Sequence, residues 1–445
     1  MFDHFFRHPF MSRAGIDALD AESVVAALCQ VETALARAEE AEGLLPAGTA
    51  AALKQALRPE AFDLAALADD VGKGGNVAIP FVKQGRSMLP EALKPAFHRG
   101  ATSQDIVDTA LMLLLKPRLQ SCLSHLARLR RAQGELMRRY RDTPMIGRTL
   151  MQQALPITFG VKVAQWTWGV CQAEQRLQAV VDTRLYVQFG GAVGVHSGLD
   201  PSGIAIMEAL ARTLGLESPL LPWHTDRQPI LELMGAVDAV AVALEKAALD
   251  IALLCQSEIG ELSEPAAPGV GGSSSMPHKR NPVACARIRA AARQIHGQHG
   301  VIVNAGAQPL ERGLGEWHAE WAPLLDAVLS LEGALESMVP LLEGLEVHEA
   351  SMKRNLRLSG GAIMAEPATR LLCDIMSSDD ALELAQRAGE EARRECRDYA
   401  EVLLEFSAVA EDLDPDEVRS ALSIELYIGS SLHQVDRCLS YLQSF

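Results

Sequence analysis

The clearest apolar repeat in the sequence, PILELMGAVDAVAVALEKAALDIALLCQSEIGEL at residues 229–262, constrains the fold more than any other feature. Aliphatic residues recur in it at alternating steps of four and three: Leu233, Val237, Val240, Leu244, Ala247, Ile251 and Leu254. This spacing places them on one seam of an α-helix, as in a coiled coil. A helix over the whole range would be about 50 Å long. Charged residues such as Asp238 and Glu245 interrupt the run, so it is not a membrane span.

Three more segments show helical periodicity, and strand signals are nearly absent. They are residues 104–141, where we expect Pro117 to bend the helix, 157–188 and 318–344. We therefore predict an all-α fold with a central bundle of long helices. Because such helices bury too little surface within one chain, we expect several chains to pack them together. The predicted domains are an N-terminal, mostly helical domain at 1–103, the bundle at 104–345 and a small C-terminal helical domain at 346–445.

The composition excludes several classes of protein. A net charge of −16 argues against nucleic acid as a partner, because phosphate binding needs a basic surface. The opening MFDHFFRHPFMSR carries charges where a signal peptide needs an unbroken apolar run, and no stretch of 18 apolar residues follows, so we expect a cytoplasmic protein that does not bind a membrane. The eight cysteines are scattered, without C-x-x-C spacing. The sequence contains no metal-ligand set and no cofactor motif, so we expect any chemistry to use protein groups alone.

Three polar stretches interrupt the helical pattern. They are HRGATSQDIVDTA at 98–110, IGRTLMQQALPITFG at 146–160 and GGSSSMPHKRNP at 271–282. Each has a purely structural interpretation: helix N-caps in the first two cases, and a Gly/Ser linker closed by prolines in the third. A linker, however, does not require a basic cluster and an Asn between prolines directly before a new helix.

Together the three stretches resemble the signatures of the fumarase/aspartase superfamily. The signature G-S-S-x-M-P-x-K-x-N is complete from Gly272 to Asn281, T-S-x-D is present at 102–105, and G-R-T-H-x-Q is matched at 147–152 except for its histidine. The resemblance covers nearly the whole chain. It implies three helical domains and a homotetramer with a twenty-helix core, whose active sites are each assembled from three subunits.

The resemblance also implies roles for individual residues. Ser273 would be the catalytic base that removes a proton from a carbon beside a carboxylate, and Lys279, also catalytic, would favour the charged form of this serine. A serine hydroxyl is a poor base in water, so it also needs inward-facing backbone N–H dipoles. The substrate-binding residues implied by the resemblance are His98, Thr102, Ser103, Arg148, Thr149, Gln152, Asn281 and Arg312.

The sequence departs from the lyases of this superfamily at the proton donor. The histidine of G-R-T-H-x-Q, which serves the leaving group, is replaced by Leu150, and the glutamate that orients that histidine is replaced by Ala286. The histidine of the adenylosuccinate lyase motif R-H-D falls on Gly75. The nucleotide-phosphate contacts of that branch fall on Trp317 and Trp321.

These replacements favour a leaving group that needs no proton donor. A carboxylate is a weak base, so it can depart or attack unaided. If it is tethered to the same molecule, elimination and its reverse become the opening and closure of a lactone ring. The cycloisomerase branch of the superfamily, which interconverts 3-carboxy-cis,cis-muconate and carboxymuconolactone, has this chemistry. The stretches at 222–230, 258–265 and 311–321 also resemble that branch, in which we expect Leu150 to form an apolar wall beside the substrate.

An acidic protein must meet a tricarboxylate with local positive charge, and Arg148, Lys279 and Arg312 stand in the matching segments. His224 and Arg227 are weaker candidates, because WHTDR is equally consistent with an N-cap and a salt bridge.

Two alternatives remain open: a lyase of the adenylosuccinate or argininosuccinate type, and a non-catalytic structural member of the fold, like the lens crystallins. The missing histidine and glutamate argue against the first, and the complete serine–lysine signature argues against the second.

Overall fold

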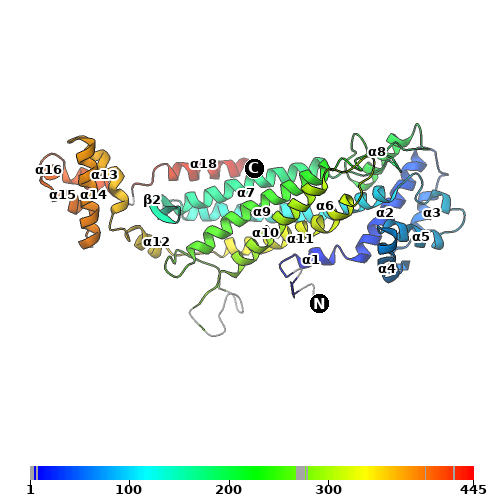
Figure 1. Cartoon of the computed structure of the whole chain (residues 1–445), viewed down its shortest axis with the longest axis horizontal. Helices are drawn as coiled ribbons and strands as arrows, with labels where there is room; N and C mark the ends of the chain where they lie inside the picture. The colour runs from blue at the N-terminus through cyan, green and yellow to red at the C-terminus, as the bar shows by residue number, and fades with distance from the viewer. Residues whose placement is uncertain (1–4, 7–8, 267–275, 277–278, 396, 424–425) are drawn as a thin grey trace. The chain divides into compact units, whose positions relative to one another are not determined.

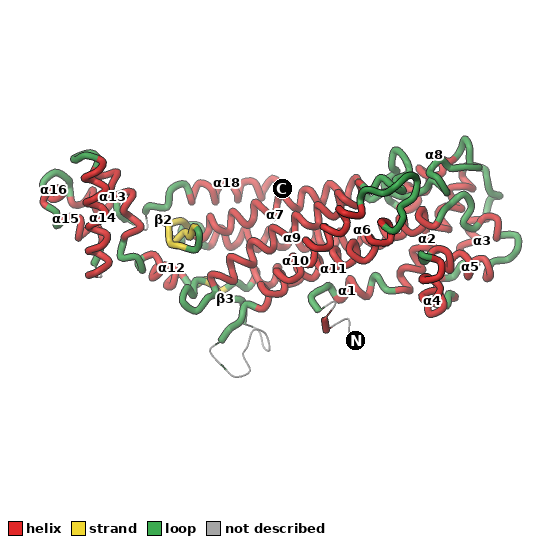
Figure 2. The backbone as a smooth tube through the Cα atoms, viewed as in Figure 1, coloured by secondary structure: helices red, strands yellow, loops and turns green. Residues whose placement is uncertain are grey.

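The computed structural model describes the chain except for residues 1–4, 7–8, 267–275, 277–278, 396 and 424–425. Helices dominate the described residues (Figure 2), which confirms the all-α prediction. The chain divides into two compact units. Unit 1 consists of residues 1–127, 172–245 and 287–338, and unit 2 of residues 128–171, 246–286 and 339–445. The division into domains at 1–103, 104–345 and 346–445 stays a prediction.

The elements follow one another along the colour gradient of Figure 1. The five longest helices of the described residues are α6 (Ser103–Arg139), α7 (Phe159–Thr183), α9 (Gln228–Leu254), α10 (Val283–Ala305) and α11 (Glu316–Glu343). The shorter α-helices before α10 are α1 (Arg13–Asp17), α2 (Ala21–Ala41), α3 (Thr49–Ala56), α4 (Leu64–Gly74), α5 (Ala78–Met88) and α8 (Gly203–Leu214). Those after α11 are α12 (Glu349–Leu356), α13 (Ala365–Leu372), α14 (Ser378–Glu395), α15 (Tyr399–Leu404), α16 (Ser407–Ala410), α17 (Pro415–Ala421) and α18 (Ser431–Ser444).

Short 3₁₀ helices and strands complete the described elements. The 3₁₀ helices are η2 (Pro59–Ala61), η3 (Lys94–Ala96) and η4 (Ala362–Met364). The strands are β1 (Pro144–Thr149), β2 (Gln152–Thr158), β3 (Leu262–Ser263) and β4 (Glu346–Val347). Each strand pairs with one antiparallel partner, β1 with β2 and β3 with β4.

Helix α9 carries the seam predicted from the sequence. All seven seam residues, from Leu233 to Leu254, are buried. The helix nevertheless ends at Leu254, eight residues before the predicted end. The chain turns there because Gly260 adopts a φ of +58°, and the backbone N–H of Glu261 donates to the carbonyl oxygen of Leu254 at 3.0 Å. Glycine reaches this left-handed conformation without the steric penalty of a side chain.

Contacts inside unit 1 show which long helices are neighbours. Helix α6 contacts α11, where Arg118 Nη1 lies 3.4 Å from Glu332 Oε1. Helix α9 contacts α10, where Arg293 Nε lies 3.3 Å from Glu245 Oε1. Pro117 lies inside α6, which continues past it to Arg139 as one helix. The four predicted long helices thus correspond to α6, α7, α9 and α11, apart from their ends, whereas α10 was not among the predicted ranges.

The hairpin β1–β2 was not predicted. Its register pairs Pro144 with Thr158 and Thr149 with Gln152, so residues 157–158 belong to a strand and not to the start of the next helix. The hairpin was missed because most of its residues do not alternate clearly between polar and apolar. Pairing between the two strands, which is not a local property, stabilises it.

Helix α2 positions acidic side chains inside unit 1. Asp20 caps its N-terminus by accepting a hydrogen bond from the backbone N–H of Ser23 at 2.8 Å. Its buried face packs against α3 and α8 and is mostly aliphatic, but it also contains Glu32 and Glu39. These two residues are seven positions apart and therefore lie on the same face of the helix.

In unit 2, the C-terminal helices have a hydrophobic core of their own. It extends from Met364 to Leu422 and includes the fully buried Val402 and Leu403. Helix α13 packs against α14, and α14 against α15. This cluster occupies most of the predicted C-terminal segment.

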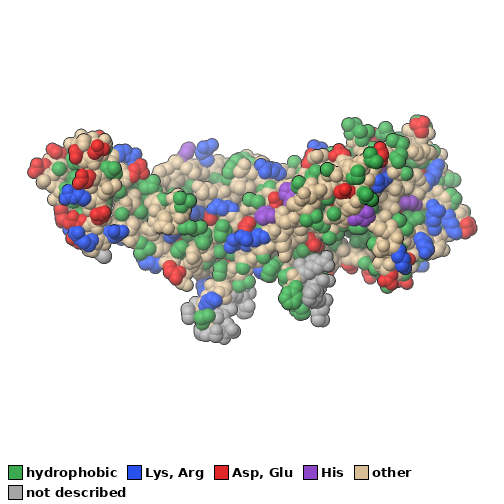
Figure 3. Space-filling model, viewed as in Figure 1, with side chains coloured by type: hydrophobic (Ala, Val, Ile, Leu, Met, Phe, Trp, Pro, Cys, Tyr) green, Lys and Arg blue, Asp and Glu red, His purple; other side chains and the backbone are tan. Residues whose placement is uncertain are grey.

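The surface in view in Figure 3 carries acidic and basic side chains that are interspersed. Within the described ranges, no helix combines the length and the apolar character needed to cross a bilayer. Several large apolar side chains are nevertheless exposed on the long helices, among them Trp168, Val242, Val301 and Val303.

Candidate active site

The predicted site residues are divided between the two units. Unit 1 contains His98, Thr102, Ser103 and Arg312, and unit 2 contains Arg148, Thr149, Gln152, Lys279 and Asn281. Ser273 lies outside the described residues.

Asp105 organises the T-S-x-D segment in unit 1. Its carboxylate is buried and accepts backbone N–H groups from Thr102 and Gly191, both at 2.9 Å. Its other oxygen lies 2.6 Å from His224 Nε2. The bond to Thr102 reaches back across the first turn of α6, as in a capping box. Asp105 therefore accepts the Thr102 N–H at the start of the helix and joins two loops to it, while an N-cap from the hydroxyl of Thr102 or Ser103 stays a prediction.

His98 is held in an unusual backbone conformation five residues before α6. Its φ is +58°, a region that residues with a side chain rarely adopt. The backbone N–H of His98 donates to Glu32 Oε2 at 2.9 Å, and its ring Nδ1 lies 2.7 Å from Glu32 Oε1. One buried carboxylate of α2 therefore contacts both the backbone and the ring of this predicted substrate-binding residue.

Arg312 is largely occupied by protein acceptors. Its Nη1 donates to Gln104 Oε1 at 2.8 Å, and its Nη2 donates to the carbonyl oxygens of Gly191 and Ala192 at 3.2 and 2.6 Å. Burial lowers the pKa of Arg312, against the opposing effect of nearby carboxylates. These bonds attach the loop at 190–192 to the start of α6.

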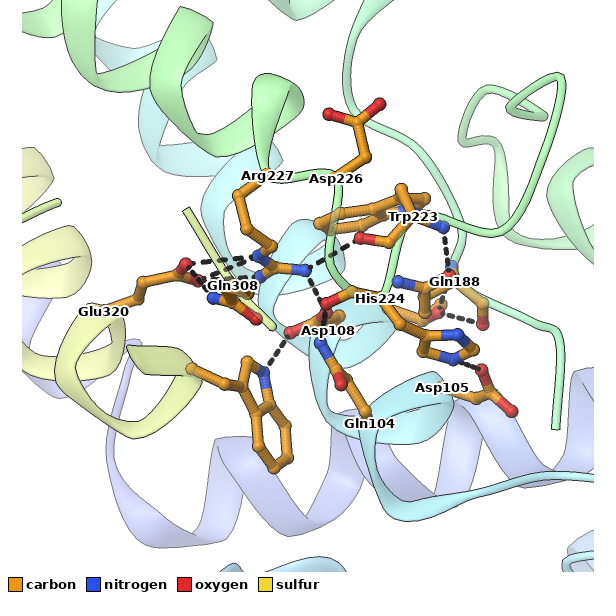
Figure 4. A network of polar contacts seen from close by, with 12 residues as sticks. Gln104, Asp105, Asp108, Gln188, Trp223, His224, Asp226, Arg227, Gln308 and Glu320 are labelled. Atoms are coloured by element: carbon orange, nitrogen blue, oxygen red, sulfur yellow. Dashed lines mark hydrogen bonds and ion pairs between the residues drawn. The ribbon is translucent and has the colours of Figure 1, made fainter. Parts of the chain in front are cut away.

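Figure 4 shows that Arg227 points into a buried network that joins three segments of unit 1. Its Nη1 donates to Asp108 Oδ2 at 2.8 Å, and its Nη2 donates to Glu320 Oε2 at 2.8 Å. The guanidinium also stacks over Trp223 at 4.5 Å. Burial alone would lower the pKa of Arg227, but the two carboxylates outweigh burial and raise it. The salt-bridge interpretation of WHTDR is therefore correct for Arg227, and Trp317 completes the network by donating to Asp108.

In unit 2, Arg148 lies on β1 and forms a two-pronged ion pair. Its Nη1 and Nη2 donate to the two oxygens of Glu261 at 2.9 and 2.7 Å. Glu261 is fully buried and also accepts from Asn355 Nδ2 at 2.7 Å. The positive charge that was predicted to meet the substrate is thus compensated by a buried carboxylate of the same chain.

Leu150 and Met151 form the tip of the β1–β2 hairpin. Their φ angles are +48° and +64°, and the flanking Thr149 and Gln152 pair directly. Two central residues with positive φ define a type I′ turn, which favours Asn and Gly. The side chains are 96% and 73% exposed in the single chain. The position of the superfamily histidine is thus an exposed leucine on a strained turn, and not a packing residue.

The C-terminal end of the signature loop is attached to unit 2 by Arg280. Its Nη1 and Nη2 bind the two oxygens of Glu346, both at 3.0 Å, and Nη2 also donates to the carbonyl oxygen of Glu264 at 2.7 Å. The carboxylate of Glu264 caps α10 by accepting the N–H groups of Ala284 and Cys285 at 3.0 and 2.8 Å. Arg280 therefore holds this end of the loop.

Lys279 and Asn281 lie beside this anchor. Their backbones make local bonds: the N–H of Lys279 donates to the Met276 carbonyl oxygen at 3.0 Å, and the Asn281 carbonyl oxygen accepts from the Val283 N–H at 2.9 Å. Among the described residues, none pairs with the Lys279 ammonium group.

Two acidic residues of the site were missed from the sequence. Glu32 and Glu261 contact His98 and Arg148, respectively, and both are buried. The signal for Glu32 is its position on the apolar face of α2, where a carboxylate needs a partner. Glu261 lies within the stretch at 258–265 that resembles the cycloisomerase branch, but no local pattern identifies its partner.

Comparisons with known proteins show similarity over nearly the whole chain. A family model described as "Lyase" matches residues 16–297. A 3-carboxy-cis,cis-muconate cycloisomerase of Bradyrhizobium diazoefficiens is 38% identical and covers 98% of this chain and 97% of its own. A nitrosuccinate lyase of Streptomyces davaonensis is 39% identical, covering 93% of this chain and 90% of its own. The crystal structure of the 3-carboxy-cis,cis-muconate lactonizing enzyme from Pseudomonas putida matches with a TM-score of 0.91 and 35% identity, covering 99% of both chains.

Proposed function

The chain belongs to the lyase family of the fumarase/aspartase superfamily. On this basis we propose that it interconverts 3-carboxy-cis,cis-muconate and 4-carboxymuconolactone. The observation that carries this proposal is the near full-length similarity to cycloisomerases, at 38% identity in one case. This reaction belongs to the breakdown of aromatic acids such as protocatechuate by the β-ketoadipate route. The adenylosuccinate, argininosuccinate and crystallin-like alternatives lack comparable support.

The reaction is an intramolecular addition that balances without a cofactor. The distal carboxylate adds through one oxygen to the carbon that bears the 3-carboxyl group, and the electron pair of that double bond moves to the neighbouring carbon. This carbanion lies beside the remaining carboxylate and takes one proton, for which we propose Ser273 as the donor. In the reverse direction Ser273 removes the same proton and the ring carboxylate leaves.

The absence of a proton donor at two positions supports a carboxylate leaving group. The position of the superfamily histidine is Leu150, and its glutamate partner is replaced by Ala286 on the exposed side of α10. Neither side chain can transfer a proton. A departing carboxylate needs no protonation at neutral pH, because its pKa lies near 4.

Charge compensation distinguishes the cations that we propose to bind the substrate. Arg148 already has Glu261 as a two-pronged partner, whereas no described residue pairs with the Lys279 side chain. We therefore assign to Lys279 the main charge stabilisation of the developing carbanion, with Asn281 beside it. Arg148, Thr149, Gln152, Thr102, Ser103 and Arg312 then shape the site around the substrate.

We propose a homotetramer whose sites combine segments from different copies. The exposed apolar side chains of α9 and α10 support this assembly, since valines such as Val242 and Val303 gain free energy when a second chain covers them. In such an assembly the exposed tip of the β1–β2 hairpin is available to a neighbouring copy.

One assay distinguishes the candidate functions. The purified chain is incubated with 3-carboxy-cis,cis-muconate, and the loss of diene absorbance is followed. Parallel incubations contain nitrosuccinate, adenylosuccinate or argininosuccinate. We expect turnover of the muconate alone. If the chain turned over nitrosuccinate instead, its proposed function would be that of the nitrosuccinate lyase of Streptomyces davaonensis, which is 39% identical to this chain.

Two variants test the assigned roles. Ser273→Ala should abolish turnover, and Lys279→Met should lower kcat by about 100- to 1,000-fold, because a preorganised charge is lost in the transition state. Light scattering should show an unchanged assembly for both variants. Loss of assembly together with activity would support the linker interpretation of the signature loop.

A further inference from the structure

We propose that Glu32 is a positioning residue for this reaction: its buried carboxylate holds the His98 ring through Nδ1, so that Nε2 faces the ligand and donates to a substrate carboxylate. This inference rests on the proposed function for the identity of the ligand. It assigns a role to a residue of α2 that lies outside the three signature stretches.

Both carboxylate oxygens of Glu32 contact His98. Oε2 accepts the backbone N–H at 2.9 Å, while Oε1 lies 2.7 Å from ring Nδ1. The Glu32 side chain is fully buried, and the His98 side chain is 16% exposed. No described residue hydrogen-bonds to Nε2. The ring thus has one nitrogen directed at a buried carboxylate and the other without a protein partner.

The chemistry of the pair determines which atom serves the ligand. An ionised carboxylate only accepts hydrogen bonds, so Nδ1 must carry a proton when it contacts Glu32. A substrate carboxylate likewise only accepts, so Nε2 must also carry a proton to bind it. The ring is then a cation, and the Glu32 carboxylate compensates its charge at 2.7 Å.

The backbone of His98 supports a functional role over simple packing. A φ of +58° is unfavourable for histidine and persists only where the surroundings enforce it. A buried carboxylate is also costly unless it is paired and hydrogen-bonded. An apolar residue at position 32 of α2 would fill the same space without the cost of burying a carboxylate. Both unfavourable features are explained together if the pair presents Nε2 to a ligand.

The chain offers a matched control on the same helix. Glu39 lies two turns after Glu32 on the buried face of α2, and neither of its oxygens hydrogen-bonds to a described residue. Glu39→Gln therefore removes a carboxylate of the same size and burial without touching His98. Glu32→Gln, in contrast, leaves one of the two His98 donors without an acceptor, because an amide has a single acceptor oxygen.

The experiment compares kinetics and ring spectra of the full-length variants. Glu32→Gln should lower kcat/KM for 3-carboxy-cis,cis-muconate by about 10- to 100-fold, mainly through KM, while Glu39→Gln should stay within about twofold. His98→Asn, which tolerates the positive φ, should cause a similar loss, and adding Glu32→Gln to it should cause no further loss. If Glu32→Gln fails to fold, Glu32→Asp replaces it. Aspartate retains the charge but has a shorter side chain, so we expect a smaller loss of kcat/KM than the one given for Glu32→Gln.

The ring spectrum separates failure of this inference from failure of the proposed function. Nitrogen-15 NMR of the histidine rings, assigned with His98→Asn, should show a protonated Nδ1 in the unliganded wild-type chain and a changed state in Glu32→Gln. If the wild-type chain does not turn over the muconate, the proposed function is wrong, and the spectrum still tests the pair. An Nδ1 without a proton overturns the inference. So does an active wild-type chain in which Glu32→Gln and Glu39→Gln have the same kcat/KM.

Discussion

Glu39 is a buried residue whose ionisation opposes folding. Its nearest cation, Arg99, lies 3.7 Å away through Nη1, and its oxygens lack hydrogen-bond partners among the described residues. Burial raises the pKa of Glu39 from 4.5 to about 7, more than Arg99 lowers it. The folded state therefore retains this proton at a pH where the unfolded chain has lost it. Its contribution to stability falls as the pH rises from 4.5 to about 7 and is constant outside that window.

Glu39→Gln should therefore stabilise the chain at pH 8 by about 2 kcal/mol and have little effect at pH 4.5. Thermal unfolding at the two pH values, compared with the wild type, measures the difference. Glu42→Gln, which removes an exposed carboxylate at the end of the same helix, serves as the control. An equal gain at both pH values would show that Glu39 is not protonated in the folded state.

Leu150→His restores the superfamily histidine at the position where the chain departs from it. We expect no gain in kcat/KM for 3-carboxy-cis,cis-muconate, because the leaving carboxylate needs no acid. Leu150→His combined with Ala286→Glu, which restores both members of the pair, should also give no gain. The Leu150 side chain is exposed in the single chain, so neither variant should fail to fold. A clear rise in kcat/KM for either variant would contradict the leaving-group explanation.

At the scale of the element, the β1–β2 hairpin combines a strained turn with exposed apolar side chains. Replacing Leu150 and Met151 together by Asn and Gly should stabilise the chain by about 1–2 kcal/mol, because these residues suit the positive φ of a type I′ turn. Activity should fall, since the apolar wall proposed at residue 150 is lost. Thermal unfolding and kcat/KM of the same preparation measure both effects.

A double alanine variant at Leu150 and Met151 is the matched control for the hairpin. It removes the same side chains but retains the strained φ angles, so it should lose activity without gaining stability. If the Asn-Gly variant were no more stable than the alanine variant, the turn would not be strained.

At the scale of the whole molecule, the exposed valines on α9 and α10 predict the assembly. Val242→Glu should dissociate the proposed tetramer and abolish activity, because a charge at an apolar contact must be desolvated without a partner. Sedimentation velocity measures the assembly. Leu382→Glu on α14 is the control, since this side chain is similarly exposed but lies on a shorter helix of the C-terminal segment. A Val242→Glu tetramer of normal size and activity would place the interface elsewhere.

Features that depend on residues close together in the chain could be predicted without the structure. The seam of α9 was read from its spacing, and the structure buries every member from Leu233 to Leu254. Three short motifs indicate the family, which the comparisons confirm. The seam and the family are accessible to sequence analysis because helical periodicity and motif spacing are local properties of the chain. Leu150 in the second motif and Ala286 after the third favour the proposed reaction.

Which charged side chains have a compensating partner could not be predicted without the folded structure. Arg148 pairs with Glu261, Arg227 with Glu320, and Glu32 with His98, each across more than sixty positions of sequence. From the sequence, Arg148 and Arg227 were both candidates for binding the substrate. The choice between a free cation and a salt bridge depends on the distance between side chains on different elements, and the strength of an ion pair falls with that distance and with exposure to water. That distance exists only once the chain has folded.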